Sequence, residues 1–93
     1  MSDEQASGVF VVTLEAVERA GEPPLTVLAF AEGADATAAQ AVAVRETERD
    51  GFTDIRALRA GEITDPGALP DDFRDAMANA RRYGCWLIIY ETP

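Results

Sequence analysis

Few side chains in this sequence could do chemistry, and the first to consider is its one cysteine, Cys85. A catalytic cysteine needs a lowered pKa, which a neighbouring histidine or a helix N-terminus usually provides. The chain contains no histidine, and Cys85 follows the C-terminal end of a predicted helix, where the helix dipole disfavours a thiolate. The sequence therefore favours Cys85 as a small buried core residue, and a single cysteine excludes an internal disulfide.

Three aspartates, Asp71, Asp72 and Asp75, open a predicted helix and form the clearest acidic cluster. Asp71 and Asp75 are spaced i, i+4, so on a helix their carboxylates lie on one side and could share a hard cation. The simpler interpretation is that carboxylates in the first turn of a helix are favourable without any metal. No loop with EF-hand spacing surrounds them, so we expect neither a metal site nor a cofactor.

A second acidic stretch contains Glu46, Glu48 and Asp50. Together with the three aspartates it could present a row of charges that imitates nucleic-acid phosphates to a basic protein. The alternative is a solvated helix end, because Arg45 and Arg49 alternate with these acids.

Other residue types that carry catalysis are missing. All eight basic residues are arginines, so Schiff-base chemistry and a P-loop, which both need lysine, are excluded. The absence of histidine removes the usual zinc and acid–base sites, and the only serines are Ser2 and Ser7. Arg81 and Arg82 could bind an anion, but such a pair also neutralises a helix C-terminus. We therefore predict no catalytic residues.

Composition limits the remaining functions. The chain has 93 residues and a net charge of −9, which predicts one domain that repels nucleic acid and does not bind it directly. No run approaches the ~20 apolar residues of a membrane helix, and the opening MSDEQASG is polar and acidic, unlike a signal peptide. We expect a cytoplasmic protein with a disordered polar tail at 1–8 and a single α+β domain at 9–93.

The positions and spacing of apolar residues predict four strands and two helices. The strands are expected at 8–17, 25–33, 52–63 and 85–91, and the helices at 34–51 and 70–84. The first two strands are joined by a short polar linker and should form an antiparallel hairpin. The third strand is interrupted by charges, which is typical of an edge or near-edge strand.

The order β-β-α-β-α-β predicts a two-layer sandwich, with a four-stranded mixed sheet and both helices on one face. The segment CWLIIYE, 85–91, is apolar on both sides and should be a central strand. In that arrangement the other sheet face is apolar and is not covered by a helix, so we expect a partner to bind it. Its expected interface residues are Val9, Val11, Leu28, Phe30, Trp86 and Tyr90.

The first hypothesis for function is therefore a non-enzymatic protein-binding or regulatory module that uses this face to bind another protein or a second copy. One alternative is a small ligand-binding domain or enzyme of the dimeric plait type, with polar groups from Tyr83, Tyr90, Arg56 and Asp54. The other is an acidic nucleic-acid mimic that binds a basic protein through Asp71, Asp72 and Asp75.

Overall fold

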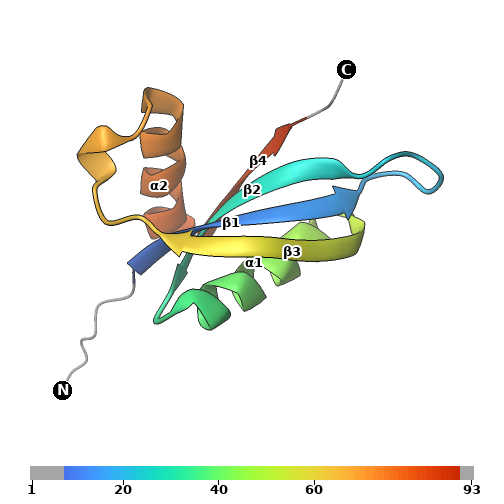
Figure 1. Ribbon diagram of the computed structural model, residues 1–93, viewed down its shortest axis with the longest axis horizontal. Coiled ribbons are helices and arrows are strands. Elements are labelled where there is room, and N and C mark those ends of the chain that lie inside the picture. Colours follow the sequence, from blue (N-terminus) through green and yellow to red (C-terminus); the bar gives the residue numbers. More distant parts are fainter. Residues whose placement is uncertain (1–7, 91–93) are drawn as a thin grey trace.

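The computed structural model describes residues 8–90, which form an α+β fold of a four-stranded sheet and two α-helices (Figure 1). The predicted tail lies outside the described residues, except for Gly8, which begins the first strand. The strands are β1 (Gly8–Val17), β2 (Leu25–Gly33), β3 (Thr53–Glu62) and β4 (Cys85–Tyr90). The helices are α1 (Ala36–Arg49) and α2 (Asp71–Tyr83), and a short 3₁₀ turn, η1 (Pro66–Ala68), precedes α2.

The centre of the sheet is the hairpin of β1 and β2, which pair antiparallel over their whole length, as the short linker predicted. The strand order is β3-β1-β2-β4, and every neighbouring pair is antiparallel. The prediction of a mixed sheet is therefore wrong. The prediction that 52–63 forms an edge or near-edge strand is confirmed, because β3 pairs with β1 alone.

The prediction that the C-terminal strand is central is also wrong, because β4 forms the opposite edge and pairs only with β2. Its apolar character has a different cause. The side chains of Cys85 and Leu87 pack toward one core, and that of Ile88 packs toward a second core on the other face. A strand whose two faces each contact a core has apolar residues on both faces, whether it lies at the centre or at the edge of the sheet.

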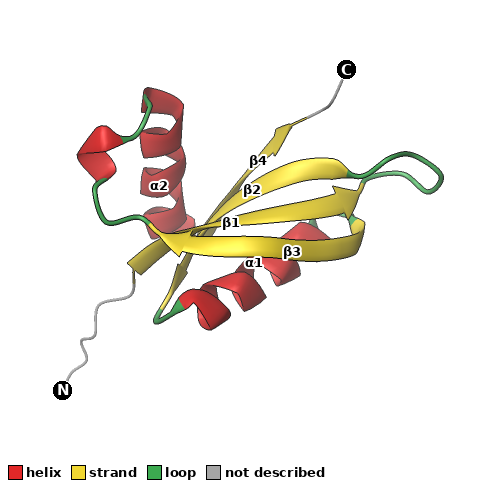
Figure 2. Ribbon diagram, viewed as in Figure 1, coloured by secondary structure: helices red, strands yellow, loops and turns green. Residues whose placement is uncertain are grey.

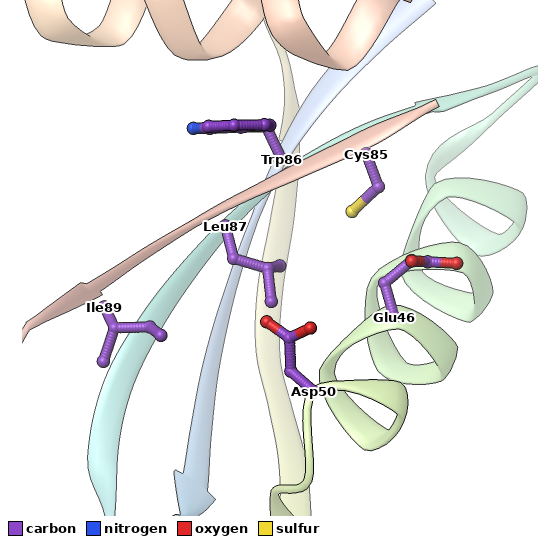
Figure 3. Close-up of a pocket in the computed structure, with 6 residues that line it drawn as sticks. All are labelled: Glu46, Asp50, Cys85, Trp86, Leu87 and Ile89. Carbon is purple, nitrogen blue, oxygen red and sulfur yellow. The ribbon is translucent and has the colours of Figure 1, made fainter. Parts of the chain in front are cut away.

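The two helices pack on opposite faces of the sheet, which corrects the prediction that they share one face. Alternate residues of β1 separate the two cores: Phe10, Val12 and Leu14 pack with α1, whereas Val9 packs with α2. In Figure 3 the two helices lie on either side of β4. The apolar second face of the hairpin, which the sequence suggested was open, is therefore partly covered by α2 of the same chain.

Local signals fix the ends of α1. The Asp35 side chain accepts a hydrogen bond from the backbone N–H of Ala38 at 2.8 Å, which caps the N-terminus of the helix. Gly51 follows the C-terminus with φ of 98°, a conformation that glycine adopts without strain. The second half of α1 was expected to face water, but Thr47 is fully buried and donates its hydroxyl to the carbonyl of Ala43. Burial of Thr47 orients this half of the helix toward the sheet.

The helix α2 ends directly before β4 (Figure 2). Its first turn carries Asp71 and Asp72 and its last turn Arg81 and Arg82, charges that suit both ends of the helix dipole. Gly84 has φ of 92°, and its N–H donates to the carbonyl of Ala80 at 2.7 Å, so the chain leaves the helix and enters the strand at once. Neither α1 nor α2 is long and apolar enough to cross a membrane.

Candidate functional site

The exposed large apolar side chains gather around β4. Trp86, Ile89 and Tyr90 are each about 40% exposed, and Tyr83 at the end of α2 is 64% exposed. Within residues 8–90 the one other large apolar side chain this exposed is Leu58, on β3. We call Tyr83, Trp86, Ile89 and Tyr90 the β4 surface. Exposed apolar side chains that gather in one region are typical of interaction sites, so the β4 surface is the candidate site of this chain.

The aromatic part of the β4 surface is held in place by local contacts. The rings of Tyr83 and Trp86 stack with centroids 6.0 Å apart, and the guanidinium of Arg82 lies 5.7 Å from the centre of the Tyr83 ring. Stacking of this kind limits the rotamers of both aromatic side chains before any partner arrives. A preorganised aromatic pair loses less conformational entropy on binding.

Within residues 8–90, the backbone of β4 pairs with another strand on one side only. The N–H of Glu32 in β2 donates to the carbonyl of Gly84 at 3.1 Å, so these two residues form a hydrogen-bonded pair of the antiparallel ladder. Such pairs alternate, so the peptide groups of Trp86, Ile88 and Tyr90 point toward β2. The peptide groups of the residues between them, Cys85, Leu87 and Ile89, point away from the sheet.

The two edges of the sheet differ in their protection against further pairing. Edge strand β3 exposes Asp54, Arg56, Arg59 and Glu62, and its pairing with β1 has two register shifts. Charges and bulges of this kind discourage another chain from adding to an edge. Strand β4 has no charged residue, and its pairing with β2 is regular. Among the residues that the structure describes, β4 is therefore the sheet edge that lacks these protections.

A hollow of about 300 Å³ lies beside this edge, between β4 and the C-terminal half of α1 (Figure 3). Its lining residues are Glu46, Asp50, Cys85, Trp86, Leu87 and Ile89. Figure 3 shows Cys85, Leu87 and Ile89 on the side of the strand that faces α1, whereas Trp86 points to the opposite side. The hollow thus has an apolar wall from β4 and two carboxylates on α1.

Burial raises the pKa of the Cys85 thiol from 9.0 to about 11, and the carboxylates of Glu46 and Asp50 add to the shift. The sequence predicted the direction of this pKa shift from the helix dipole, but its main cause is burial. A thiol with a raised pKa is neutral at physiological pH and is a poor nucleophile. Cys85 is half-buried, so the expectation of a buried core residue is met in part.

This raised pKa predicts slow alkylation of Cys85. Iodoacetamide at pH 8 should modify the folded protein about tenfold more slowly than the urea-unfolded chain, because a hundredfold smaller thiolate fraction outweighs its higher nucleophilicity. The same shift makes the free energy of unfolding depend on pH, because folding favours the neutral thiol of Cys85. This contribution to stability is complete below pH 9 and is lost as the pH rises through 11. Glu46→Gln should speed the reaction, and equal rates for the folded and unfolded chain would contradict the prediction.

The predicted interface residues divide into two groups. Val9 and Phe30 are buried against α2, and Val11 and Leu28 are half-buried in the same core. Trp86 and Tyr90 are exposed on the β4 surface. The prediction of an open face opposite both helices is wrong, because α2 covers that face. A partner can reach Trp86 and Tyr90 directly, but it could reach Val9 and Phe30 only by displacing α2.

The polar residues proposed for a ligand site are not brought together. Asp54 and Arg56 lie on β3, at the opposite edge of the sheet from Tyr90 on β4. Arg56 instead forms an ion pair with Glu15 on β1, at 3.6 Å. These positions give no support to a shared pocket.

The aspartates at the start of α2 make contacts within their own helix. Asp71 forms an ion pair with Arg74, and the carboxylate of Asp72 accepts a hydrogen bond from the N–H of Phe73 at 3.1 Å. Over the part of the chain that the structure describes, no group of three acidic, cysteine or histidine side chains could hold a metal ion. At the other end of α2, Arg81 lies 3.9 Å from the carboxylate of Glu32.

Comparison of this chain with family models, curated proteins and solved structures finds no match. The function must therefore be inferred from the residues and their arrangement. Of the exposed side chains, the sequence analysis named Trp86 and Tyr90 as interface residues and Tyr83 as a possible ligand-site residue. It did not single out Ile89, nor the position of Glu46 and Asp50 opposite β4. The missing signal was the place of β4 at the sheet edge.

Proposed function

We propose that this chain is a non-enzymatic protein-binding module that contacts its partner through the β4 surface. The observation that carries the proposal is the gathering of exposed Tyr83, Trp86, Ile89 and Tyr90 around an unprotected strand edge. Tryptophan and tyrosine are the residues most enriched among those that dominate binding energy at protein interfaces. Trp86 and Ile89 point to opposite sides of β4, so a protein partner that binds along the strand edge contacts both.

The chemistry of the chain also favours binding over catalysis. Lysine and histidine are absent from the sequence, and the thiol of Cys85 is held neutral by burial and two neighbouring carboxylates. The polar groups of the enzyme alternative lie at opposite edges of the sheet. No specific contact favours the acidic-mimic alternative, because Asp71 is already paired with Arg74.

The test is affinity capture with matched variants. Tagged protein, Trp86→Ala and Leu58→Ala are compared in a lysate of the source cells, with captured proteins quantified by mass spectrometry. Trp86→Ala should reduce capture of a specific partner about thirtyfold, because loss of a central interface tryptophan costs about 2 kcal/mol or more. Leu58→Ala removes an equally exposed apolar side chain from the other edge and should have no effect.

Two outcomes would contradict the proposal. Equal capture by Trp86→Ala and the unchanged protein, with both folded by circular dichroism, would show that the β4 surface is not the binding site. A partner that dissociates at high salt and is lost on charge reversal of Asp71, Asp72 and Asp75 would instead support the acidic mimic.

A further inference from the structure

The open edge of β4 can extend the sheet by one more strand. The peptide groups of Cys85, Leu87 and Ile89 point outward, and within residues 8–90 no strand pairs with β4 on that side. An extended segment that pairs with such an edge gains main-chain hydrogen bonds for affinity, and its alternate side chains give specificity. Because β4 is regular and uncharged, nothing in its own sequence opposes this addition.

The two faces of an added strand would meet different surroundings. On one face, every second side chain would lie beside the hollow, where Glu46 and Asp50 provide carboxylates. Glu46 is also 3.5 Å from Arg49, whereas Asp50 forms no ion pair with any residue in the 8–90 range. On the other face, the intervening side chains would lie beside Trp86 and Tyr90, which are aromatic and exposed.

We infer, building on the proposed function, that the partner supplies an extended segment that pairs with β4 as a fifth strand. Its side chains alternate, with basic residues toward Glu46 and Asp50 and apolar residues toward Trp86 and Tyr90. The occupant is thus a basic segment of another protein. The argument for a basic segment is charge complementarity, because the hollow contains two carboxylates and the whole chain has a net charge of −9.

The same charges disfavour a second copy of this chain. A two-fold pairing of β4 with β4 makes one continuous sheet with both α1 helices on the same face. The hollow at each β4 edge would then face a copy that carries the same carboxylates and the same net charge of −9. Like charges across an interface oppose association.

Three synthetic peptides as long as β4 test the inference. The first alternates arginine and valine, the second has the same composition with the arginines in one block, and the third alternates glutamate and valine. The alternating arginine–valine peptide should bind at least tenfold more tightly than the others and should slow hydrogen exchange of the Leu87 and Ile89 amides. The amides of Trp86 and Ile88, already bonded to β2, should change less.

Two matched pairs of variants locate the contacts. Ile89→Pro removes an outward N–H, whereas Ile89→Ala removes the side chain and keeps that donor; the proline variant should bind about tenfold more weakly than the alanine variant. Glu46→Gln combined with Asp50→Asn should weaken binding about tenfold. Glu48→Gln, an exposed acid of α1 that does not line the hollow, should leave binding unchanged.

Several results would overturn the inference. These are no binding by the alternating arginine–valine peptide, equal binding by the block peptide, or equal affinities of Ile89→Pro and Ile89→Ala. A doubled mass in light scattering that Ile89→Pro returns to the monomer would assign the edge to a second copy. None of these results decides the proposed function, which is tested by whether Trp86→Ala loses the captured partner.

Discussion

Phe30→Ala is expected to lower the free energy of unfolding by about 3–5 kcal/mol. Phe30 is fully buried, and its ring meets that of Phe73 edge-to-face with centroids 5.3 Å apart. It joins β2 to α2 in the smaller of the two cores, where Ala76 and Ala80 fill little volume. The same core contains Phe73 and Met77, and relaxation of such neighbours fills a cavity only in part, so the cavity left by the ring adds to the loss.

The effect should be large against the total stability of a chain of this size, which is on the order of 5–14 kcal/mol. Urea unfolding followed by circular dichroism measures it. Leu58→Ala, which removes an exposed side chain from β3, is the control and should change stability by less than about 0.5 kcal/mol. A loss below about 1 kcal/mol for Phe30→Ala would mean that α2 does not pack on this face as described.

Gly33→Ala is expected to be the second most damaging change, with a loss of about 1–3 kcal/mol. A Cβ atom at Gly33 would lie 2.6 Å from the backbone nitrogen of Ala39 and 2.9 Å from its Cα. These atoms belong to the helix backbone, which cannot rotate away as a side chain can. The added methyl group must therefore push α1 away from the end of β2 and loosen the larger core.

A matched control for this change is Gly61→Ala on β3. A Cβ at Gly61 would meet no atom within 4 Å, and the change should leave the free energy of unfolding within about 0.5 kcal/mol of the original value. Thermal unfolding of both variants separates close approach from the general effect of replacing a strand glycine. If the two midpoints shift equally, the steric argument at Gly33 is wrong.

The sequence predicted the elements of this fold well, because their signals are local. Asp35, Gly51 and Gly84 mark helix ends through capping and left-handed backbone conformations, which depend only on nearby residues. The strand order was not predicted, because pairing between β2 and β4 joins residues far apart in the chain. The pattern of CWLIIYE is the same for a central strand and for an edge strand between two cores.

The candidate site was predicted in part for the same reason. Trp86 and Tyr90 were predicted on an open sheet face and are exposed, but Phe30 was predicted on the same face although α2 covers it. Glu46 and Asp50 were recognised as an acidic helix end. Their position opposite β4 depends on how α1 packs against the sheet, which no local pattern in the sequence contains.

The central position of the β1–β2 hairpin also sets an order of events in folding. Its strands are close in sequence, so their pairing has a small loop-closure cost, whereas β4 must find β2 across the intervening α1, β3 and α2. We therefore expect the hairpin to form early in folding and β4 to dock later. Interactions formed late are the first to be lost in partial opening. The edge that we assign to the partner is thus also the part of the sheet whose amides we expect to exchange most readily, and an added strand would slow that exchange.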